Sequence, residues 1–192
     1  MFEVKEYHWT MRCHVENFRQ KAMLEGNDAL PLSKYNPDDI EGQTFYIMEN
    51  NEIVALVALE VDHYATKNPK VLRACRFHTL KQYRNLALGT SYLFPAYISW
   101  AKKMEYDCVY WTQDIKNKGL NAIYQRKRKP IKHEHLNNDK FWNSVQLDHR
   151  WLFQVDKKSD LLQYVYYVDL KESGYKLNPI DCVIWQEHDG QI

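Results

Sequence analysis

The sequence predicts an α+β fold with a mixed, mostly antiparallel central sheet flanked by helices. Residues 44–48 and 53–62 are strand-like, and the Asn50-Asn51 pair between them suits a tight hairpin because asparagine tolerates positive φ. Residues 71–80 follow as a third strand of the same meander. Beyond them the pattern runs helix, strand, helix, which favours a parallel pair of strands joined by a crossover.

The segment before the hairpin predicts one strand and one helix. Residues 2–7 alternate apolar and polar side chains, as a half-buried strand does. Residues 11–25 carry an apolar stripe at helical spacing, and Gly26 follows as a stop signal. Residues 30–42 contain two prolines and predict a loop or a short helix. The stripe consists of Met11, Val15, Phe18 and Ala22.

The segment after residue 90 predicts further helices and strands. Pro95 would cost about 3 kcal/mol inside a helix, so the helix either begins after Thr90 or bends near Pro95. Residues 130–145 are polar and indicate a surface excursion. The predicted elements are helices at 91–104 and 117–128, and strands at 108–111, 149–155 and 161–170. The stripe of the first of these helices is Leu93, Tyr97, Trp100, Ala101 and Met104.

The length and charge of the chain limit its organisation and its partners. Its 192 residues show no internal repeat, low-complexity tract or linker, so we expect one domain over residues 1–192. The 26 basic and 25 acidic residues nearly cancel. This balance leaves no global field to attract nucleic acid or an anionic membrane, so an anion site must be local.

The cysteines and the N-terminus indicate where the chain resides. The four cysteines are far apart and form no CxxC pair, which argues against a zinc knuckle. The first residues lack the basic start and apolar core of a signal peptide, and no apolar run reaches the ~18 residues that span a bilayer. We therefore expect a reducing cytoplasm, and no metal or membrane partner.

The most informative stretch is residues 83–90, Tyr-Arg-Asn-Leu-Ala-Leu-Gly-Thr, between the third strand and the next helix. Small side chains at Ala87 and Gly89 let the backbone turn tightly and approach a ligand. Amides at a helix N-terminus lack partners, and the helix dipole favours an anion there. Arg84 adds a formal positive charge. The pattern predicts a phosphate-binding loop, with a structural turn that binds no ligand as the alternative.

The order of the elements and this loop resemble the GNAT superfamily of acyl-CoA-dependent N-acetyltransferases. The resemblance covers about residues 2–170 and leaves 171–192 as a C-terminal extension. The family pattern is Gln or Arg, two residues, Gly, one residue, then Gly or Ala. Residues 84–89 follow it, except that Ala87 stands in place of the first glycine. A right-handed backbone at that position would tolerate alanine, and we expect one.

A second motif lies in the predicted helix at 117–128. Asn117, Leu120 and Tyr124 hold the positions where family members often have Asn, a small or apolar residue, and Tyr. The glycine-aromatic pair that often follows is missing, and Arg128-Lys129 stands there.

The resemblance implies acetyl-CoA as the donor substrate and assigns candidate residues to it. The pantetheine arm would pair with the end of the strand predicted at residues 71–80, and the pyrophosphate would bind amides of residues 84–90. The implied donor-binding residues are Phe77, Thr79, Leu80, Arg84, Asn85, Leu86, Ala87, Leu88, Gly89, Thr90 and Asn117.

The resemblance also implies an acid and a base for attack of an amine on the thioester. Tyr124 matches the position of the usual acid, and a phenol with a pKa near 10 suits protonation of a thiolate. The usual positions of the base hold Arg73 and Cys75, so we consider Glu60 and His78 on chemical grounds. As alternatives, Tyr124 is a core tyrosine, Glu60 a hairpin-end carboxylate and His78 a half-buried sheet histidine.

Two other motifs have simpler explanations than a ligand. The basic run at residues 126–129 suits a helix C-terminus, where the dipole favours cations, and contact with the 3′-phosphate of CoA is the alternative. His133 and His135 could pair on a metal, but no third ligand is near them in sequence, so we expect a solvated loop.

The predicted function is transfer of an acyl group, most simply acetyl, from CoA to a primary amine of a small molecule or peptide. The alternative is a GNAT-fold binding module without catalysis, which the missing base and the missing glycine favour. A nucleic-acid-binding protein is a third, weaker hypothesis. A homodimer is left open.

Overall fold

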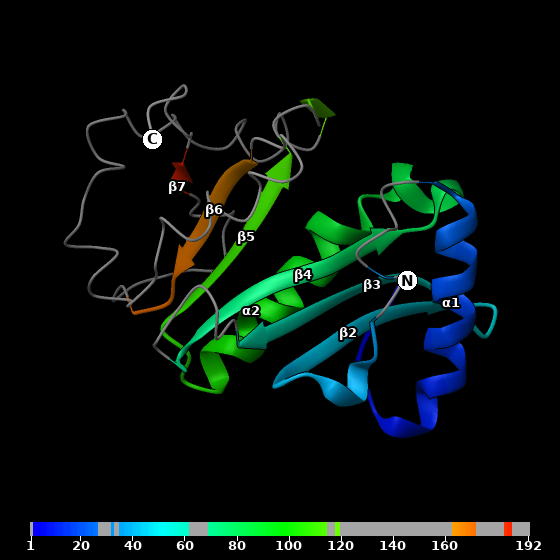
Figure 1. Cartoon of the computed structure of the whole chain (residues 1–192), viewed down its shortest axis with the longest axis horizontal. Coiled ribbons are helices and arrows are strands. Elements are labelled where there is room, and N and C mark those ends of the chain that lie inside the picture. The colour runs from blue at the N-terminus through cyan, green and yellow to red at the C-terminus, as the bar shows by residue number, and fades with distance from the viewer. Residues whose placement is uncertain are drawn as a thin grey trace. The chain divides into compact units, whose positions relative to one another are not determined.

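The computed structural model describes residues 2–26, 32, 35–61, 69–114, 118–119, 163–171 and 183–185 (Figure 1). The chain forms two compact units. The first comprises Met1–Val61 and Ala74–Met104, and the second comprises Asp62–Arg73 and Glu105–Ile192.

The strands of the first unit are β1 (Val4–Glu6), β2 (Gly42–Glu49), β3 (Glu52–Val61) and the second part of β4 (Val71–Thr79). They follow one another in chain order, with antiparallel pairing of β1 with β2 and of β2 with β3. The turn between β2 and β3 has φ of 50° at Asn50 and 65° at Asn51. Positive φ at both central residues is what a two-residue hairpin turn requires, so the predicted hairpin is confirmed.

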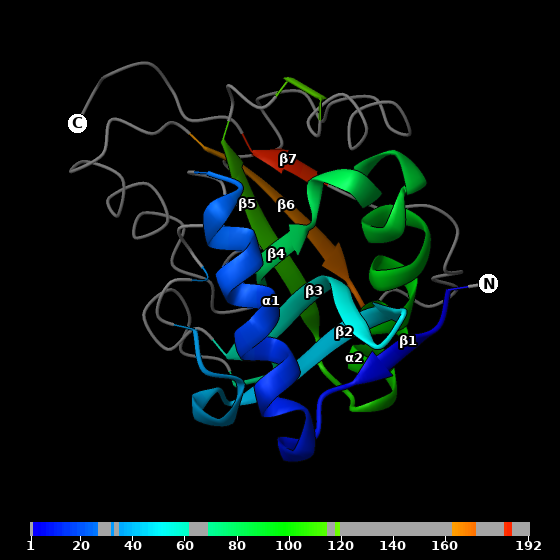
Figure 2. The ribbon, with the colours of Figure 1, turned by 90° about the vertical axis from the view of Figure 1, so that its right-hand side faces the viewer.

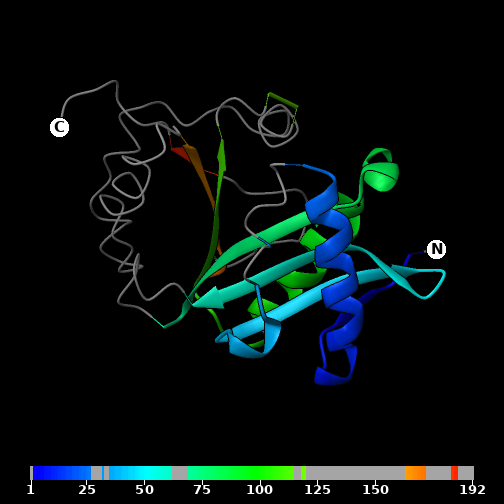
Figure 3. The same cartoon turned by 45° about the vertical axis from the view of Figure 1, so that its right-hand side comes forward.

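Helical segments of the first unit lie before β2 and after β4. They are η1 (Trp9–Met11), α1 (Arg12–Leu24), η3 (Pro37–Asp39), η4 (Lys81–Leu86), η5 (Gly89–Leu93) and α2 (Phe94–Lys103). In Figure 2, α1 covers one face of the sheet of the first unit and α2 covers the other. Figure 3 shows α1 crossing β2, β3 and β4 on its own face.

The core of the first unit is built around β3. Its residues from Ile53 to Leu59 are all buried, because one face packs on α1 and the other on α2. On the α1 face, Val15, Phe18 and Ala22 join a cluster that includes Leu56 and Cys75. These three residues belong to the predicted helical stripe, which is thereby confirmed. On the α2 face, the rings of Phe45 and Trp100 meet at 5.7 Å.

The second unit contains a mixed set of strands. Residues 71–73 of β4 pair in parallel with β5 (Cys108–Asp114), which confirms the predicted parallel pair. β5 pairs antiparallel with β6 (Gln163–Asp169), and β6 pairs antiparallel with β7 (Val183–Trp185). Together with the first unit this gives the predicted α+β class, with mixed and mostly antiparallel strand pairing.

Several predicted elements lie outside the described residues. They are most of the helix at 117–128, the polar segment at 130–145 and the strand at 149–155. Within the described part of the chain, no helix has the length and apolar character that crossing a bilayer requires.

Candidate functional site

The predicted phosphate-binding loop begins where β4 ends, and all of it lies in the first unit. The Leu80 amide donates to the carbonyl of Val54 at 3.0 Å, so the loop leaves the sheet directly after β4. The 3-10 turn η4 then leads to Ala87, and a continuous helical segment runs from Leu88 to Lys103. The order strand, tight turn, helix is the one that the sequence predicts.

Ala87 corrects one expectation about this loop. Its φ is 52° and its ψ is 31°, which is the left-handed conformation and not the right-handed one expected. The left-handed conformation costs an L-residue roughly 1–2 kcal/mol, because Cβ approaches the following carbonyl oxygen. The chain reverses here between η4 and the next helix, and this reversal requires the positive φ. Glycine would adopt it without that cost.

The helix after Ala87 begins with amides that have no partner within that helix. The first bond of this helix runs from the Ser91 amide to the Ala87 carbonyl at 2.9 Å, so the amides of Leu88, Gly89 and Thr90 precede it and have no partner within the helix. A π turn, η5, occupies residues 89–93, and the Phe94 amide bonds back to the Gly89 carbonyl. Such N-terminal amides and the helix dipole together favour an anion.

Pro95 is the second residue of α2 and directly follows the π turn η5, where the i→i−4 bonding of the helix is already interrupted. Regular α-helix begins at Phe94, but the helical segment itself begins at Leu88, so the predicted start after Thr90 holds only for the α-helical part.

Gly89 is packed against Phe77 of β4. A Cβ atom on Gly89 would lie 2.2 Å from Cζ of the Phe77 ring, which is far inside contact distance. Phe77 as a whole residue is 39% exposed. A side chain at residue 89 would therefore force the Phe77 ring to move, whether or not a ligand approaches.

Other predicted loop residues divide into buried and exposed sets. Thr79, Leu80 and Leu88 are buried, so they offer a ligand their backbone only. Asn85 and Leu86 are exposed, and Thr90 is half-buried.

Arg84 is anchored to the end of β4 and to Glu25. Its Nε donates to the Thr79 carbonyl at 3.0 Å, and its Nη2 lies 3.5 Å from Oε2 of Glu25. The side chain is 39% exposed, so its charge remains open to solvent.

His78, a candidate base, points toward α1. Only 4% of the residue is exposed, and its ring meets the ring of Phe18 edge-on at 6.0 Å. Its Nε2 lies 3.0 Å from Oε2 of Glu25, at the end of α1. The structure therefore gives His78 a carboxylate partner, an arrangement known from catalytic histidines and from structural ones.

Glu60, the other candidate base, lies near the end of β3. Its Oε1 is 3.8 Å from Nη2 of Arg76, and its side chain is 20% exposed. Arg76 has a φ of 55° in the middle of β4. The Nε atom of Arg76 is buried without a hydrogen-bond partner.

Glu25 is the residue that the sequence analysis missed. It follows the last residue of α1 and contacts His78, Arg84 and the backbone amide of Lys81. The one local signal is its place before Gly26, whose φ of 123° ends the helix. Its partners lie more than fifty residues away in sequence, at a separation of 53 for His78, so no local pattern indicates them.

Tyr124 and Asn117 lie outside the described residues, so their roles stay predictions. Among the described residues, no group of three or more histidine, cysteine or acidic side chains is arranged to hold a metal ion.

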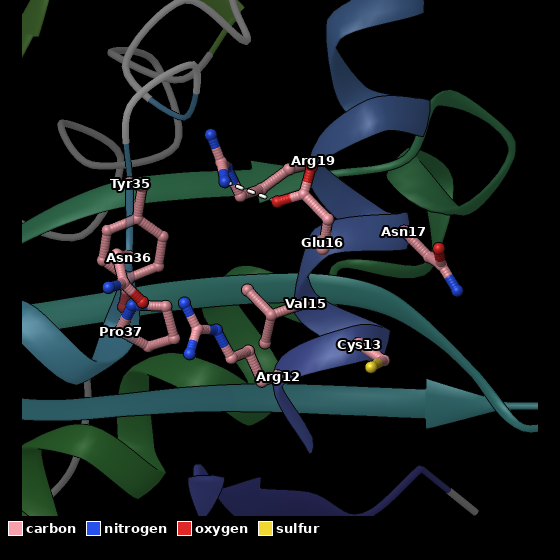
Figure 4. A pocket seen from close by; sticks show the side chains of 9 residues that line it. All are labelled: Arg12, Cys13, Val15, Glu16, Asn17, Arg19, Tyr35, Asn36 and Pro37. Carbon is pink, nitrogen blue, oxygen red and sulfur yellow. Dashed lines mark hydrogen bonds and ion pairs between the residues drawn. The ribbon is translucent and has the colours of Figure 1, made fainter. Parts of the chain in front are cut away.

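A separate cavity of about 520 Å³ lies between α1 and residues 35–37 (Figure 4). Arg19 bridges its wall, because Nη1 lies 2.6 Å from Oε2 of Glu16 and Nε donates to the Leu32 carbonyl. Tyr35 is buried beside it and pairs with the hydroxyl of Thr44, and burial raises the pKa of this phenol. None of the predicted site residues lines this cavity.

No protein-family model matches the sequence, and no curated protein matches it in sequence. Solved structures resemble its fold. An acetyltransferase of the GNAT family from Staphylococcus aureus Mu50 covers 89% of this chain and 100% of its own length, with 20% identity and a TM-score of 0.55. An acetyltransferase of the GNAT family from Streptococcus pneumoniae covers 66% of this chain and 83% of its own length, with 18% identity and a TM-score of 0.53.

A third similar structure has a named acceptor. It is the ribosomal-protein-S18-alanine N-acetyltransferase from Escherichia coli. The alignment covers 92% of this chain and 99% of that one, with 11% identity and a TM-score of 0.54.

Proposed function

We propose that this chain, which has the fold of the GNAT acetyltransferases, transfers an acyl group, most simply acetyl, from CoA to a primary amine. The observation that carries the proposal is the helix N-terminus at residues 88–90. Its first amides have no partner within the helix and follow a left-handed turn at Ala87, and the charge of Arg84 lies in the same loop. This geometry supports a site for the pyrophosphate of the donor.

The proposed donor site uses the residues that surround these amides. The pyrophosphate would bind the amides of residues 84–90, and the pantetheine arm would run along Phe77, Thr79 and Leu80. Asn117 would complete the site. The exposed ring of Phe77 supports this role, because it offers an apolar surface next to Gly89.

The proposed reaction is direct attack of the amine nitrogen on the thioester carbonyl carbon. The carbon–nitrogen bond forms, the carbon–sulfur bond breaks, and CoA leaves as a thiolate. A base removes a proton from the attacking nitrogen, and an acid protonates the thiolate. We assign the base to His78 or Glu60 and the acid to Tyr124.

The acceptor is a small-molecule or peptide amine, and the chain acts as one domain over residues 1–192 in the cytoplasm. A GNAT-fold module that binds CoA without catalysis is the second candidate. The burial of His78 and the contact of Glu60 with Arg76 favour that candidate, because neither group is freely placed as a base.

The cofactor-loop assignment is tested by Thr90→Asp, with Thr90→Asn as the matched neutral control. An aspartate in the first turn of a helix stabilises the fold by roughly 0.3–1 kcal/mol, so the variant should remain folded. Its carboxylate would repel the phosphates of CoA. We expect its dissociation constant for CoA, measured by calorimetry, to rise at least about 100-fold, or roughly 2.8 kcal/mol. Equal affinities of the two variants would exclude this phosphate site.

Catalysis is tested by acetyl-CoA titration followed by detection of free thiol with a panel of amines. Thiol release that depends on one class of amine supports the transferase. Binding of acetyl-CoA with no thiol release over a broad panel supports the non-catalytic module. Absence of binding removes both candidates.

A further inference from the structure

The carboxylate of Glu25 receives three donors from two segments of the first unit. Its Oε1 accepts the backbone amide of Lys81 at 2.9 Å. Its Oε2 lies 3.0 Å from Nε2 of His78 and 3.5 Å from Nη2 of Arg84. One side chain at the end of α1 therefore contacts the candidate base, the start of η4 and the cation of the loop.

The burial of these groups makes the contact more than a surface ion pair. The side chain of His78 is 3% exposed and that of Glu25 is 19% exposed. A hydrogen bond to an ionised group is roughly twice as strong as a neutral one, and it is screened less when water is largely excluded.

The contact with Glu25 also selects one tautomer of His78. An ionised carboxylate only accepts hydrogen bonds, so Nε2 of His78 must carry the proton that it donates. In the neutral ring Nδ1 is then the nitrogen with the free electron pair. With its proton on Nε2, the neutral ring of His78 can accept another proton only at Nδ1.

We propose that Glu25 is a positioning residue that holds His78 with its proton on Nε2, so that Nδ1 accepts the proton of the attacking amine. This role rests on the proposed transferase. In the step, the amine nitrogen forms its bond to the carbonyl carbon and its proton moves to Nδ1. Glu25 keeps its negative charge and stabilises the imidazolium that results, and the proton later leaves to solvent.

Nitrogen-15 NMR of the histidine ring tests the tautomer without any substrate. In the wild-type chain we expect the proton of His78 on Nε2. In Glu25→Gln the amide group can donate to Nε2, so the proton should move to Nδ1. Glu16→Gln is the matched control, because Glu16 is a glutamate on α1 that pairs with Arg19 and Gln20 and not with His78. A proton on Nδ1 in the wild-type chain, alone or together with one on Nε2, overturns the proposal.

Kinetics then tests the consequence for turnover. In Glu25→Gln the side-chain carbonyl can still accept the Lys81 amide, so CoA affinity should stay within about threefold. We expect kcat to fall about 100-fold or more, the usual contribution of a base. In a His78→Gln background, adding Glu25→Gln should lower kcat by less than about threefold more. Both substitutions remove the same function, which is proton acceptance at Nδ1 of His78. An unchanged kcat, or an equal loss in both backgrounds, contradicts the role.

The two proposals fail in different ways. If the wild-type chain transfers no acetyl group, the proposed function fails, and the tautomer measurement alone decides whether Glu25 orients His78. If Glu25→Gln does not fold, which a thermal melt detects, the tautomer of the wild-type chain still decides it. If transfer occurs but Glu25→Gln changes only CoA affinity, Glu25 serves to hold the loop in place. The positioning role is then wrong.

Discussion

Phe77 and His78 are neighbours on β4, yet their side chains serve opposite faces of the sheet. The ring of Phe77 packs on Gly89 beside α2, whereas His78 packs on Phe18 and bonds to Glu25 at the end of α1. The first contact depends on the absence of a side chain at residue 89. The second depends on charge and hydrogen bonds. The two faces should therefore respond to different kinds of substitution.

The largest effect is expected on the α1 face, from Phe18→Ala. Phe18 is 1% exposed and lies in the core cluster against the ring of His78. Truncating a buried phenylalanine costs about 3–5 kcal/mol of unfolding free energy. Leu24→Ala on the same helix is the control, since that side chain is 88% exposed and its loss should cost less than ~0.5 kcal/mol. Urea titration of both variants measures the difference, and equal midpoints would contradict the packing described.

A smaller effect is expected on the α2 face, from Gly89→Ala. The new methyl group overlaps the Phe77 ring, and overpacking of this kind costs about 1–3 kcal/mol. In a Phe77→Ala background the overlap disappears, and alanine is favoured over glycine in a helix by roughly 0.5–1 kcal/mol. The sign of the effect should therefore reverse between the two backgrounds. A thermal melt of the four chains measures this coupling, and additive effects would show that Phe77 does not constrain Gly89.

The smallest effect is expected from Ala87→Gly in the turn between the two faces. Glycine removes the steric cost of the left-handed conformation, so the fold should gain about 1 kcal/mol. The control is Ala96→Gly, which lies within α2 and should lose roughly 0.5–1 kcal/mol. Opposite shifts of the denaturation midpoint would establish the conformation at residue 87. A loss of stability in both variants would mean that Ala87 is right-handed in solution.

Features with local causes were predictable from the sequence. The hairpin at Asn50-Asn51 depends on two residues that tolerate positive φ, and the stripe on α1 depends on helical spacing. The resemblance to the GNAT acetyltransferases is confirmed at the level of the fold. The assignment of Met104 to the apolar stripe of the next helix was wrong. Met104 is exposed, because α2 ends at Lys103.

Features with distant causes were not predictable. The left-handed conformation of Ala87 follows from the path of the chain between η4 and α2, which no neighbouring residue specifies. The close packing at Gly89 comes from Phe77, which is on β4. The contact of Glu25 with His78 joins two segments that only the folded chain brings together.

The π turn at residues 89–93 has a consequence for comparing this chain with others. A π turn takes up one residue more than an α turn, so the two parts of the helix differ in phase by one residue, or about 100°. Leu88 and Leu93 are buried five positions apart, whereas Phe94, Tyr97, Ile98 and Ala101 follow the usual spacing of three and four. An alignment with a helix that has no such turn therefore needs a one-residue gap between the loop motif and α2. Without that gap, core positions on one side would be matched to surface positions on the other.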